Sequence, residues 1–233
     1  MEPDPRSTYD RIAAHFAKTR EHAWPEVESF LTGRSATRAL DVGCGNGRHA
    51  EPLAERAESV VGVDLSRELL REATARARER GYARSFDPVH GDAAALPVAD
   101  DAVDLAVYVA ALHHLSPRAA RVRSLDELAR VLAPGGVALV SAWSTAHDRF
   151  DREAGFDTTV DWTLPDGEVV PRYYHVYSPA EFDRDLAESD LDPVDVDVSS
   201  GNCYAVVAAS DDESGSPADA GLGDGSSNAG AEE

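Results

Sequence analysis

The sequence contains a single lysine, Lys18, so arginine supplies nearly all of its positive charge. The 22 lysine and arginine residues are outnumbered by 43 aspartates and glutamates, which gives a formal net charge of −21. We expect such a surface on a protein that works in molar salt, where the Debye length falls to about 3 Å and self-repulsion is screened. An acidic chain normally argues against a nucleic-acid partner, but the same screening weakens that argument.

Cysteine is also scarce, because Cys44 and Cys203 are the only two in 233 residues. They cannot form a disulfide framework, which favours a reducing, cytoplasmic location. No apolar run approaches the roughly 20 residues of a membrane span, and the start "MEPDPRSTYD" has no signal-peptide pattern. The histidines lack HxxxH spacing and the cysteines lack CxxC spacing, so we expect no metal site.

The composition changes after residue 209. Residues 210–233 consist mainly of glycine, serine, alanine and acids, with one leucine and no aromatic residue. Such a segment cannot bury enough apolar surface to order itself. We therefore predict a disordered acidic tail over 210–233.

Strand-like and helix-like segments alternate in the preceding part of the chain. Short apolar runs typical of buried strands lie at 38–43, 59–64, 85–92, 102–114 and 137–143. Segments typical of helices lie between them, at 46–57, 66–81 and 116–136. An irregular stretch at 144–177 is followed by a helix at 178–189 and a predicted hairpin of strands at 193–200 and 202–210. The alternation predicts an α/β fold with a parallel sheet and helices on both faces.

The motif "LDVGCGNGRH" lies where the first predicted strand meets the first helix. Gly43, Gly45 and Gly47 allow a tight turn and close approach of a ligand to the backbone. The dinucleotide-binding fingerprint requires a further glycine at position 48, which is Arg48 here. A carboxylate just before the loop, at Asp41, would repel a pyrophosphate and suits a cation such as an amino group.

Two further acids follow later strands. Asp64 ends the second predicted strand, where a carboxylate can bind both hydroxyls of a ribose. Asp92, beside Ala93, follows the third and can accept from an adenine amino group. Either acid by itself could simply cap a helix, but three acids at the carboxyl ends of strands together indicate a nucleoside-containing ligand.

These motifs resemble the class I S-adenosylmethionine-dependent methyltransferases. The matching residues are Asp41 to Gly47, Asp64, "GDAAALP" at 91–97 and "LAPGG" at 132–136. The resemblance implies S-adenosylmethionine as cofactor and a seven-stranded, mostly parallel Rossmann-like sheet, whose last strand is antiparallel and inserted beside the fifth. The cofactor-binding residues that it implies are Asp41, Gly43, Cys44, Gly45, Asn46, Gly47, Asp64, Leu65, Asp92, Ala93 and Ala110.

Three further segments resemble a narrower family, the tRNA wobble-uridine carboxymethyl methyltransferases. They are "YDRIAAHFAKTREHAWPEVESFL" at 9–31, "LHHLSPRAARVRSLDELARVLAPGG" at 112–136 and "RYYHVY" at 172–177. The family esterifies 5-carboxymethyluridine in the tRNA anticodon and works with a small zinc-ribbon activator subunit. The resemblance implies a helical lid in 1–35 and a methyltransferase domain in 36–209, in which 144–177 faces the substrate.

A carboxylate acceptor has a pKa of about 4 and is already ionised, so its methylation needs orientation rather than a general base. Arginine suits bidentate contact with a carboxylate, and an aromatic ring can stack on a flipped-out base. The candidate substrate contacts are Arg20, Trp24, His114, Arg172, Tyr174 and His175. We prefer His114 over the neighbouring His113, although both could merely cap the fourth strand, and the arginines could be solvated surface residues.

Several alternatives remain at this stage. The chain could be a small-molecule O-methyltransferase that is active alone, or a non-catalytic S-adenosylmethionine-binding scaffold. A Rossmann dehydrogenase is disfavoured by Asp41 and Arg48. The third strand should form a sheet edge, where an activator strand could pair, with apolar contacts from Tyr82, Phe86 and Val89.

Overall fold

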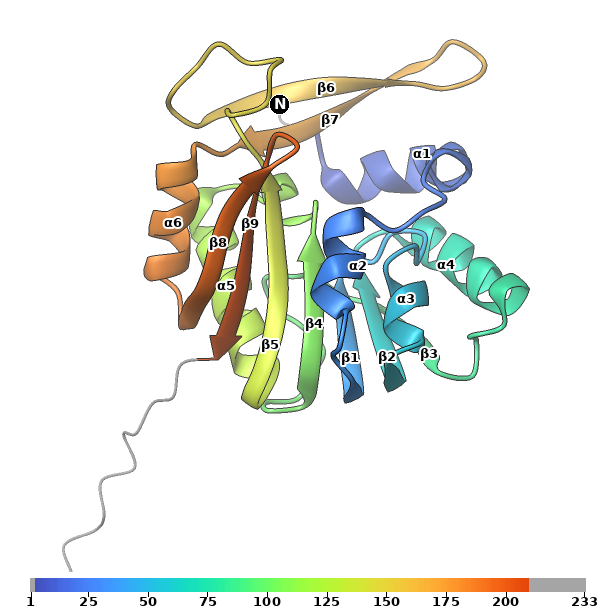
Figure 1. The fold of residues 1–233 in the computed structure, drawn as a ribbon. Coiled ribbons are helices and arrows are strands. Elements are labelled where there is room, and N and C mark those ends of the chain that lie inside the picture. Colours follow the sequence, from blue (N-terminus) through green and yellow to red (C-terminus); the bar gives the residue numbers. More distant parts are fainter. Residues whose placement is uncertain (1–2, 210–233) are drawn as a thin grey trace, which may run out of the picture.

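The computed structural model describes residues 3–209, and these contain one seven-stranded sheet. Its strands are β1 (Ala36–Val42), β2 (Ala57–Asp64), β3 (Phe86–His90), β4 (Val103–Val109), β5 (Leu132–Trp143), β8 (Leu191–Ser199) and β9 (Asn202–Ala209). They lie in the order β3-β2-β1-β4-β5-β9-β8 (Figure 1). Strands β1 to β5 are parallel, and β9 is antiparallel between β5 and β8. The predicted sheet is therefore confirmed, including its reversed last strand beside the fifth.

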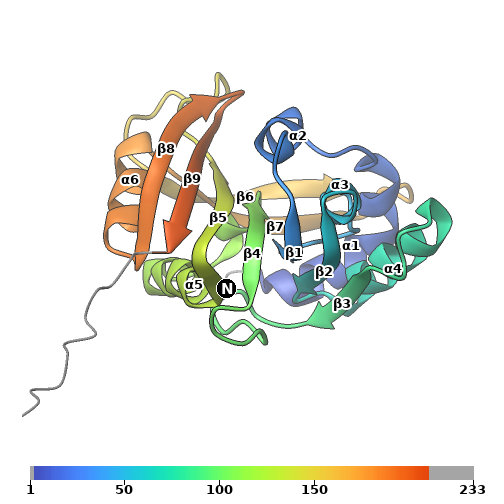
Figure 2. The same cartoon turned by 60° about the horizontal axis from the view of Figure 1, so that its bottom comes forward.

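Helices cover both faces of this sheet (Figures 1 and 2). They are α1 (Pro5–Thr19), α2 (Pro25–Leu31), α3 (Ala50–Ala54), α4 (Arg67–Arg80), α5 (Arg118–Val131) and α6 (Pro179–Ala187). Residues of β4 alternate between two apolar cores, with Ala106 and Tyr108 on the α5 and α6 side and Leu105 and Val107 on the α2 and α3 side. A central strand buried on both faces explains the continuous apolar run in its sequence.

The helix predicted over 66–81 agrees with α4, because both of its ends carry local signals. Ser66 accepts a hydrogen bond from the backbone N–H of Leu69, and Gly81 ends the helix with a φ of 85°. The helix predicted over 46–57 is shorter in the structure. Only Ala50–Ala54 is helical, since the turn at Gly45 and Gly47 uses positive φ angles that an α-helix cannot contain.

The fourth strand also ends earlier than predicted, at Val109 rather than at residue 114. Ala110 has a φ of 57°, which interrupts extended structure, and a short 3₁₀ helix covers Leu112–His114. The two histidines therefore lie on a turn above the end of the sheet rather than on the strand itself.

The prediction of an irregular stretch over 144–177 is wrong. The stretch contains an antiparallel hairpin of β6 (Phe156–Thr163) and β7 (Val169–Val176). The hairpin lies across the carboxyl end of the parallel strands, beside α1 (Figure 1). Trp162 and Val170 pack against Ile12 of α1 in a small apolar core of their own. This core joins two segments that are distant in sequence, α1 and the hairpin, and its apolar contacts stabilise the hairpin.

We predicted a helical lid over residues 1–35, and the two helices of this region have different surroundings. Helix α1 lies over the carboxyl end of the sheet (Figure 1), whereas Val27, Phe30 and Leu31 of α2 belong to one main core. The predicted tail, 210–233, lies outside the described residues. Within 3–209, none of the helices combines the length and apolar character needed to cross a membrane.

A buried ion pair fastens α6 to α5 and gives a test of the packing. Asp185 is fully buried, accepts from Arg118 at 2.7 Å and from Tyr177 at 3.1 Å, and lies 3.9 Å from the buried Arg121. Asp185→Ala should lower the free energy of unfolding by about 3 kcal/mol, because the buried Arg121 then keeps only Glu181, at 3.7 Å, as an ion-pair partner among the described residues. Urea denaturation measures this loss.

The matched control is Glu188→Ala, because Glu188 also accepts from Arg118 at 2.7 Å but has an exposed side chain. Its removal should cost less than about 1 kcal/mol. Equal losses for the two variants would contradict the packing described here.

Candidate cofactor and acceptor site

Two neighbouring cavities that share part of their lining lie at the carboxyl end of the parallel strands, between the sheet, α1 and the β6–β7 hairpin. Their volumes are about 600 and 350 Å³. The residues that line both are Tyr9, Phe16, Gly43, Gly45, Ala110 and His114. This is the edge at which open α/β sheets bind ligands.

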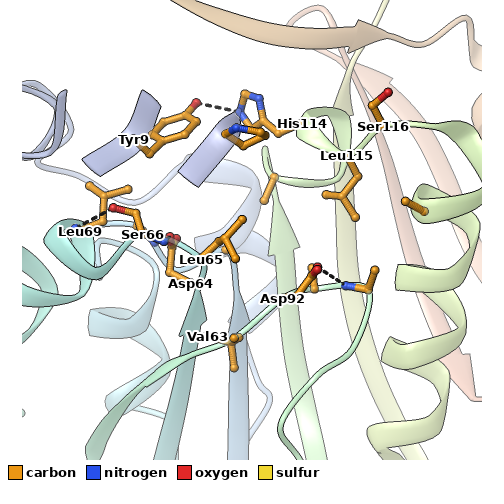
Figure 3. Close-up of a pocket in the computed structure, with 18 of the residues that line it drawn as sticks. Tyr9, Val63, Asp64, Leu65, Ser66, Leu69, Asp92, His114, Leu115 and Ser116 are labelled. Carbon is orange, nitrogen blue, oxygen red and sulfur yellow. Dashed lines mark hydrogen bonds between the residues drawn. The ribbon is translucent and has the colours of Figure 1, made fainter. Parts of the chain in front are cut away.

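The larger cavity is organised around the carboxylate of Asp64 (Figure 3). One of its oxygens accepts from the Gly45 N–H and the other from the Ser66 N–H, both at 2.8 Å. Burial raises the pKa of Asp64 to about 6. Asp64 thus fixes the turn before α4, but the cap of that helix is Ser66 and not Asp64, contrary to the alternative interpretation. Asp64 also lines the cavity, with lone pairs free to accept further hydrogen bonds.

The glycine loop between β1 and α3 brings backbone against the cavity. Gly43 and Gly45 have φ angles of 67° and 55°, and a Cβ on Gly43 would lie 2.3 Å from the Cβ of Ala111. Gly47 does not line either cavity, and its carbonyl accepts from Tyr82. All three glycines have a positive φ, 76° at Gly47, so the backbone favours glycine at each position, and close packing adds to this at Gly43 and Gly47.

The remaining predicted cofactor residues divide between the two cavities. Leu65, Asp92 and Ala93 line the larger one, and Asp92 accepts from the Ala94 N–H at 2.9 Å (Figure 3). Cys44 and Asn46 line the smaller one, and Asn46 donates to the carbonyl of Arg20 at 2.8 Å. That bond ties the glycine loop to the end of α1.

Asp41 lies beneath the glycine loop, is 1% exposed and lines neither cavity. Burial, reinforced by the nearby charge of Asp64, raises its pKa to about 7. Its Oδ2 atom has no hydrogen-bond partner among the described residues. A buried carboxylate with an open acceptor at this position fits a cationic group held at the loop.

The smaller cavity is lined by basic and aromatic side chains. Its basic residues are Arg20, Arg48, His49, His113, His114, His147, Arg149 and Arg172, and its larger aromatic residues are Tyr9, Phe16, Trp24, Trp143 and Tyr174. No aspartate or glutamate is among its lining residues in the described chain. In a protein with a net charge of −21, a cavity lined by arginines and aromatic rings without an acid in the described chain could accommodate an anion with a planar group.

His114 lies at the junction of the two cavities and its hydrogen bonds fix its tautomer. Nδ1 lies 2.8 Å from the Tyr173 carbonyl, which can only accept, so Nδ1 carries the proton. Nε2 then accepts from the Tyr9 hydroxyl at 2.8 Å. Burial lowers the pKa of His114 to about 4, so the ring is neutral at pH 7.

His113 also lines the smaller cavity, which the preference for His114 did not anticipate. Its Nδ1 accepts from the backbone N–H of Trp143 at 2.9 Å, and burial lowers its pKa well below the usual value. Both histidines are therefore neutral, and neither is free to act as a cationic carboxylate clamp.

The predicted residues of "RYYHVY" separate onto two faces of β7. Arg172 and Tyr174 line the smaller cavity, and Arg172 donates to the Tyr174 hydroxyl at 2.6 Å. Arg172 is 8% exposed and its Nε has no partner among the described residues. His175, predicted as a substrate contact, does not line the cavity. Its ring lies on the opposite face of the strand, between Asp157 at 2.7 Å and Glu181 at 3.1 Å. Strand alternation makes neighbours in sequence point apart.

Arg20 and Trp24, predicted from the N-terminal segment, both line the smaller cavity. The Arg20 guanidinium lies over Phe16 and Trp162, at 5.6 and 5.4 Å from the ring centroids. The candidate list missed several residues of the same wall, among them Tyr9, Trp143 and Arg149. Tyr9 stood in a quoted motif, whereas Trp143 and Arg149 carried no recognisable signal.

Comparison with known proteins agrees with this geometry. A family model for a methyltransferase domain, Methyltransf_11, matches residues 40–140. A tRNA (carboxymethyluridine(34)-5-O)-methyltransferase of Arabidopsis thaliana is 35% identical over 179 residues, which cover 76% of this chain and 40% of that protein. A putative methyltransferase of Encephalitozoon cuniculi is 35% identical over 72% of this chain and 78% of its own length. The chain thus spans less than half of the Arabidopsis relative.

Solved structures show the same fold. The CcbJ methyltransferase from Streptomyces caelestis superposes with a TM-score of 0.71 at 21% identity, covering 89% of this chain and 99% of that one. A putative methyltransferase in complex with the Haloferax volcanii Trm112 methyltransferase activator superposes with a TM-score of 0.67 at 17% identity, covering 88% and 97%.

The fold, the cofactor end of the sheet and these matches define the chain as a member of the S-adenosylmethionine-dependent methyltransferases. Within that class, it is homologous to the tRNA (carboxymethyluridine(34)-5-O)-methyltransferases.

The larger cavity fits S-adenosylmethionine. Asp64 would hold the ribose hydroxyls, Asp92 and Ala93 would face the adenine, and Asp41, buried beneath the glycine loop, would stabilise the amino group through its charge rather than by direct contact. When bound, the cofactor supplies an electrophilic methyl group. Its methionine end would lie near Gly43 and Gly45, which both cavities share.

The raised pKa of Asp41 predicts a stability cost that the cofactor offsets. An unfolded chain releases this proton at a pH of about 4, whereas the folded chain keeps it until about 7. The free energy of unfolding therefore falls as the pH rises between these values. Asp41→Asn should be more stable than the wild type at pH 8 without cofactor, by up to about 4 kcal/mol.

Urea denaturation at pH 5 and pH 8 measures this difference, which should shrink at the lower pH. Calorimetric titration should show weaker S-adenosylmethionine binding by the same variant. A variant that is less stable than wild type at both pH values would contradict the assignment.

Proposed function

We propose that this protein transfers a methyl group from S-adenosylmethionine to the carboxylate of 5-carboxymethyluridine, or a close derivative, at the wobble position of tRNA. The named activity of the homologous proteins supports this acceptor. The observation that carries the proposal is the smaller cavity, which shares lining residues with the larger one. Arginine and aromatic residues line it, and no acid is among its lining residues in 3–209.

The chemistry requires positioning rather than proton transfer. The acceptor carboxylate is ionised at neutral pH, so a neutral His113 and His114 suffice and no side chain has to remove a proton. Arg172, held by Tyr174 and lying 4.8 Å from the ring of Trp162, is placed to orient the carboxylate. Trp24 and Trp143 offer aromatic surface for the uracil ring.

Removal of the gene should abolish the methyl ester of wobble carboxymethyluridine in cellular tRNA and leave the free acid in its place. Mass spectrometry of tRNA nucleosides measures both species. An unchanged tRNA profile would reject the tRNA substrate and favour the small-molecule O-methyltransferase.

In the purified protein, Arg172→Gln should lower kcat/KM for the tRNA by roughly 100-fold, because a charge-assisted pair to the carboxylate is worth up to about 3 kcal/mol. S-adenosylmethionine binding should be retained. The matched control is Arg38→Gln, since Arg38 is exposed at the amino end of β1, away from both cavities. Equal effects of the two substitutions would contradict the role of Arg172.

We also propose that a small activator subunit, of the kind found with the Haloferax volcanii structure, pairs with the edge of β3. The apolar contacts predicted for it need correction, because Phe86 is 7% exposed and packs against Gly62 in the core. Val89 packs against the other core and Tyr82 bonds to the glycine loop. The edge thus offers backbone groups more than apolar side chains.

The register shows which backbone groups these are. The Ser85 carbonyl accepts from β2 at 2.7 Å and the Gly91 amide donates to β2 at 3.1 Å, so residues with odd numbers bond inward. Phe86, Pro88 and His90 therefore face the open edge. Because proline has no N–H, a partner strand would find donors only at the other two.

Addition of the activator should slow amide hydrogen exchange at Phe86 and His90, while the amides of β8 at the other edge of the sheet stay unchanged. Exchange measured by NMR or mass spectrometry with and without the activator reports this. Co-purification without protection at these two amides would place the interface elsewhere.

A further inference from the structure

Arg48 and His49 lie in the wall of the smaller cavity, directly before α3, and neither has a role in the function described above. Their side chains gather around Trp24. The Arg48 guanidinium lies 5.2 Å from the centroid of the Trp24 ring, and the His49 ring lies 6.2 Å from it. The glycine loop thus presents a cation and an imidazole at one end of the acceptor cavity.

Both groups lack the partners that buried polar groups usually have. Within residues 3–209, Arg48 forms no ion pair, although acids outnumber bases two to one in the chain. His49 is 4% exposed and its Nε2 has no hydrogen-bond partner among the described residues. An unpartnered buried nitrogen beside an unpaired cation indicates a ligand that is anionic and accepts hydrogen bonds.

The Arg48 side chain remains a cation at pH 7. Burial, followed by the charge of Arg20, lowers the pKa of Arg48 to about 10, which leaves it charged at pH 7. Burial also lowers the pKa of His49 well below its usual value, so the imidazole is neutral and can donate one N–H. The charge of Asp41 opposes the effect of Arg20 only in part, so a further anion in the cavity would stabilise the Arg48 cation.

The charge of the acceptor group alone does not neutralise the positive charge of the arginines that line this cavity. Four arginines line it, namely Arg20, Arg48, Arg149 and Arg172, and none forms an ion pair within the described chain. The carboxylate of a carboxymethyluridine contributes one negative charge. In RNA, each nucleotide is also flanked by phosphodiesters, which contribute one charge apiece.

We propose that Arg48 and His49 form an anion subsite that binds an RNA phosphodiester adjacent to the acceptor nucleotide. This proposal rests on the proposed function, because it takes the ligand to be the nucleic acid that carries the acceptor. Arg48 binds the phosphate while packed on Trp24, and His49 donates from its neutral ring. The subsite selects an acceptor within a strand over the free nucleoside, and it lies on the same loop that turns around the cofactor.

The test measures binding of a synthetic anticodon stem-loop to the full chain over a range of KCl concentrations. Arg48→Gln should weaken binding roughly tenfold, the loss expected for one charge-assisted contact. The slope of log affinity against log salt should fall by about 0.7, the value for one single-stranded phosphate. Arg48→Lys should retain most of the slope, and the surface control Arg38→Gln should match the wild type.

A second ligand identifies the phosphate. In it, uncharged methylphosphonates replace the two phosphodiesters that flank the wobble residue. The wild type should bind this stem-loop roughly tenfold more weakly, whereas Arg48→Gln should bind both stem-loops equally, because the contact is already lost. Additive losses from the two changes would overturn the proposal, as would an unchanged salt slope in Arg48→Gln.

Cofactor affinity separates the phosphodiester from the carboxylate of S-adenosylmethionine, which is the other anion near this loop. Calorimetry should show that Arg48→Gln changes the affinity for S-adenosylmethionine less than the affinity for the stem-loop, although Arg48 acts on the charge of the nearby Asp41. A selective loss of cofactor affinity would overturn the proposal. The binding assay needs no turnover, so it can support the subsite even if no carboxymethyluridine is methylated. Conversely, the wild type could methylate the tRNA while Arg48→Gln leaves the slope of log affinity against log salt unaltered. This result would reject the subsite but not the proposed function.

Discussion

The imidazole of His114 joins three segments that lie far apart in the sequence. It accepts from Tyr9 of α1 and donates to the carbonyl of Tyr173 in β7, while its own backbone belongs to the turn after β4. Because its pKa is about 4, this donor and acceptor pattern persists at physiological pH. His114 lines both cavities, so the boundary between them depends on this bridge, and under the proposed function cofactor and acceptor would meet there.

Charge is segregated in the molecule. Acids outnumber bases two to one in the chain, whereas the smaller cavity has arginines and no acid among its described lining residues. A low-dielectric cavity strengthens each contact with an entering anion and is screened less by salt than the outer surface is. An acidic protein can therefore recognise an anionic substrate locally, although its net charge repels it at long range.

The cofactor end of the sheet contains several features that cost stability. Ala110 has a φ of 57° and lines both cavities. Asp41 has a buried oxygen without a hydrogen-bond partner in 3–209, and the nearby charge of Asp64 helps to raise the pKa of Asp41. Such features persist where the surrounding fold fixes them and where a ligand offsets them. Their concentration at one edge of the sheet is consistent with a site that is completed by its cofactor.

The sequence by itself determined the parallel sheet, the glycine turn at Gly43 and the acids at the ends of strands, because strand burial and turn conformations are local properties of the chain. The tertiary structure decided the β6–β7 hairpin, whose core includes Ile12 from α1, and the turning of His175 away from the cavity that Arg172 enters. It also brought Arg48 and Trp143, unremarkable in sequence, into the acceptor wall. These outcomes depend on contacts between distant segments and on which face of a strand is buried, and neither is encoded in any short stretch of residues.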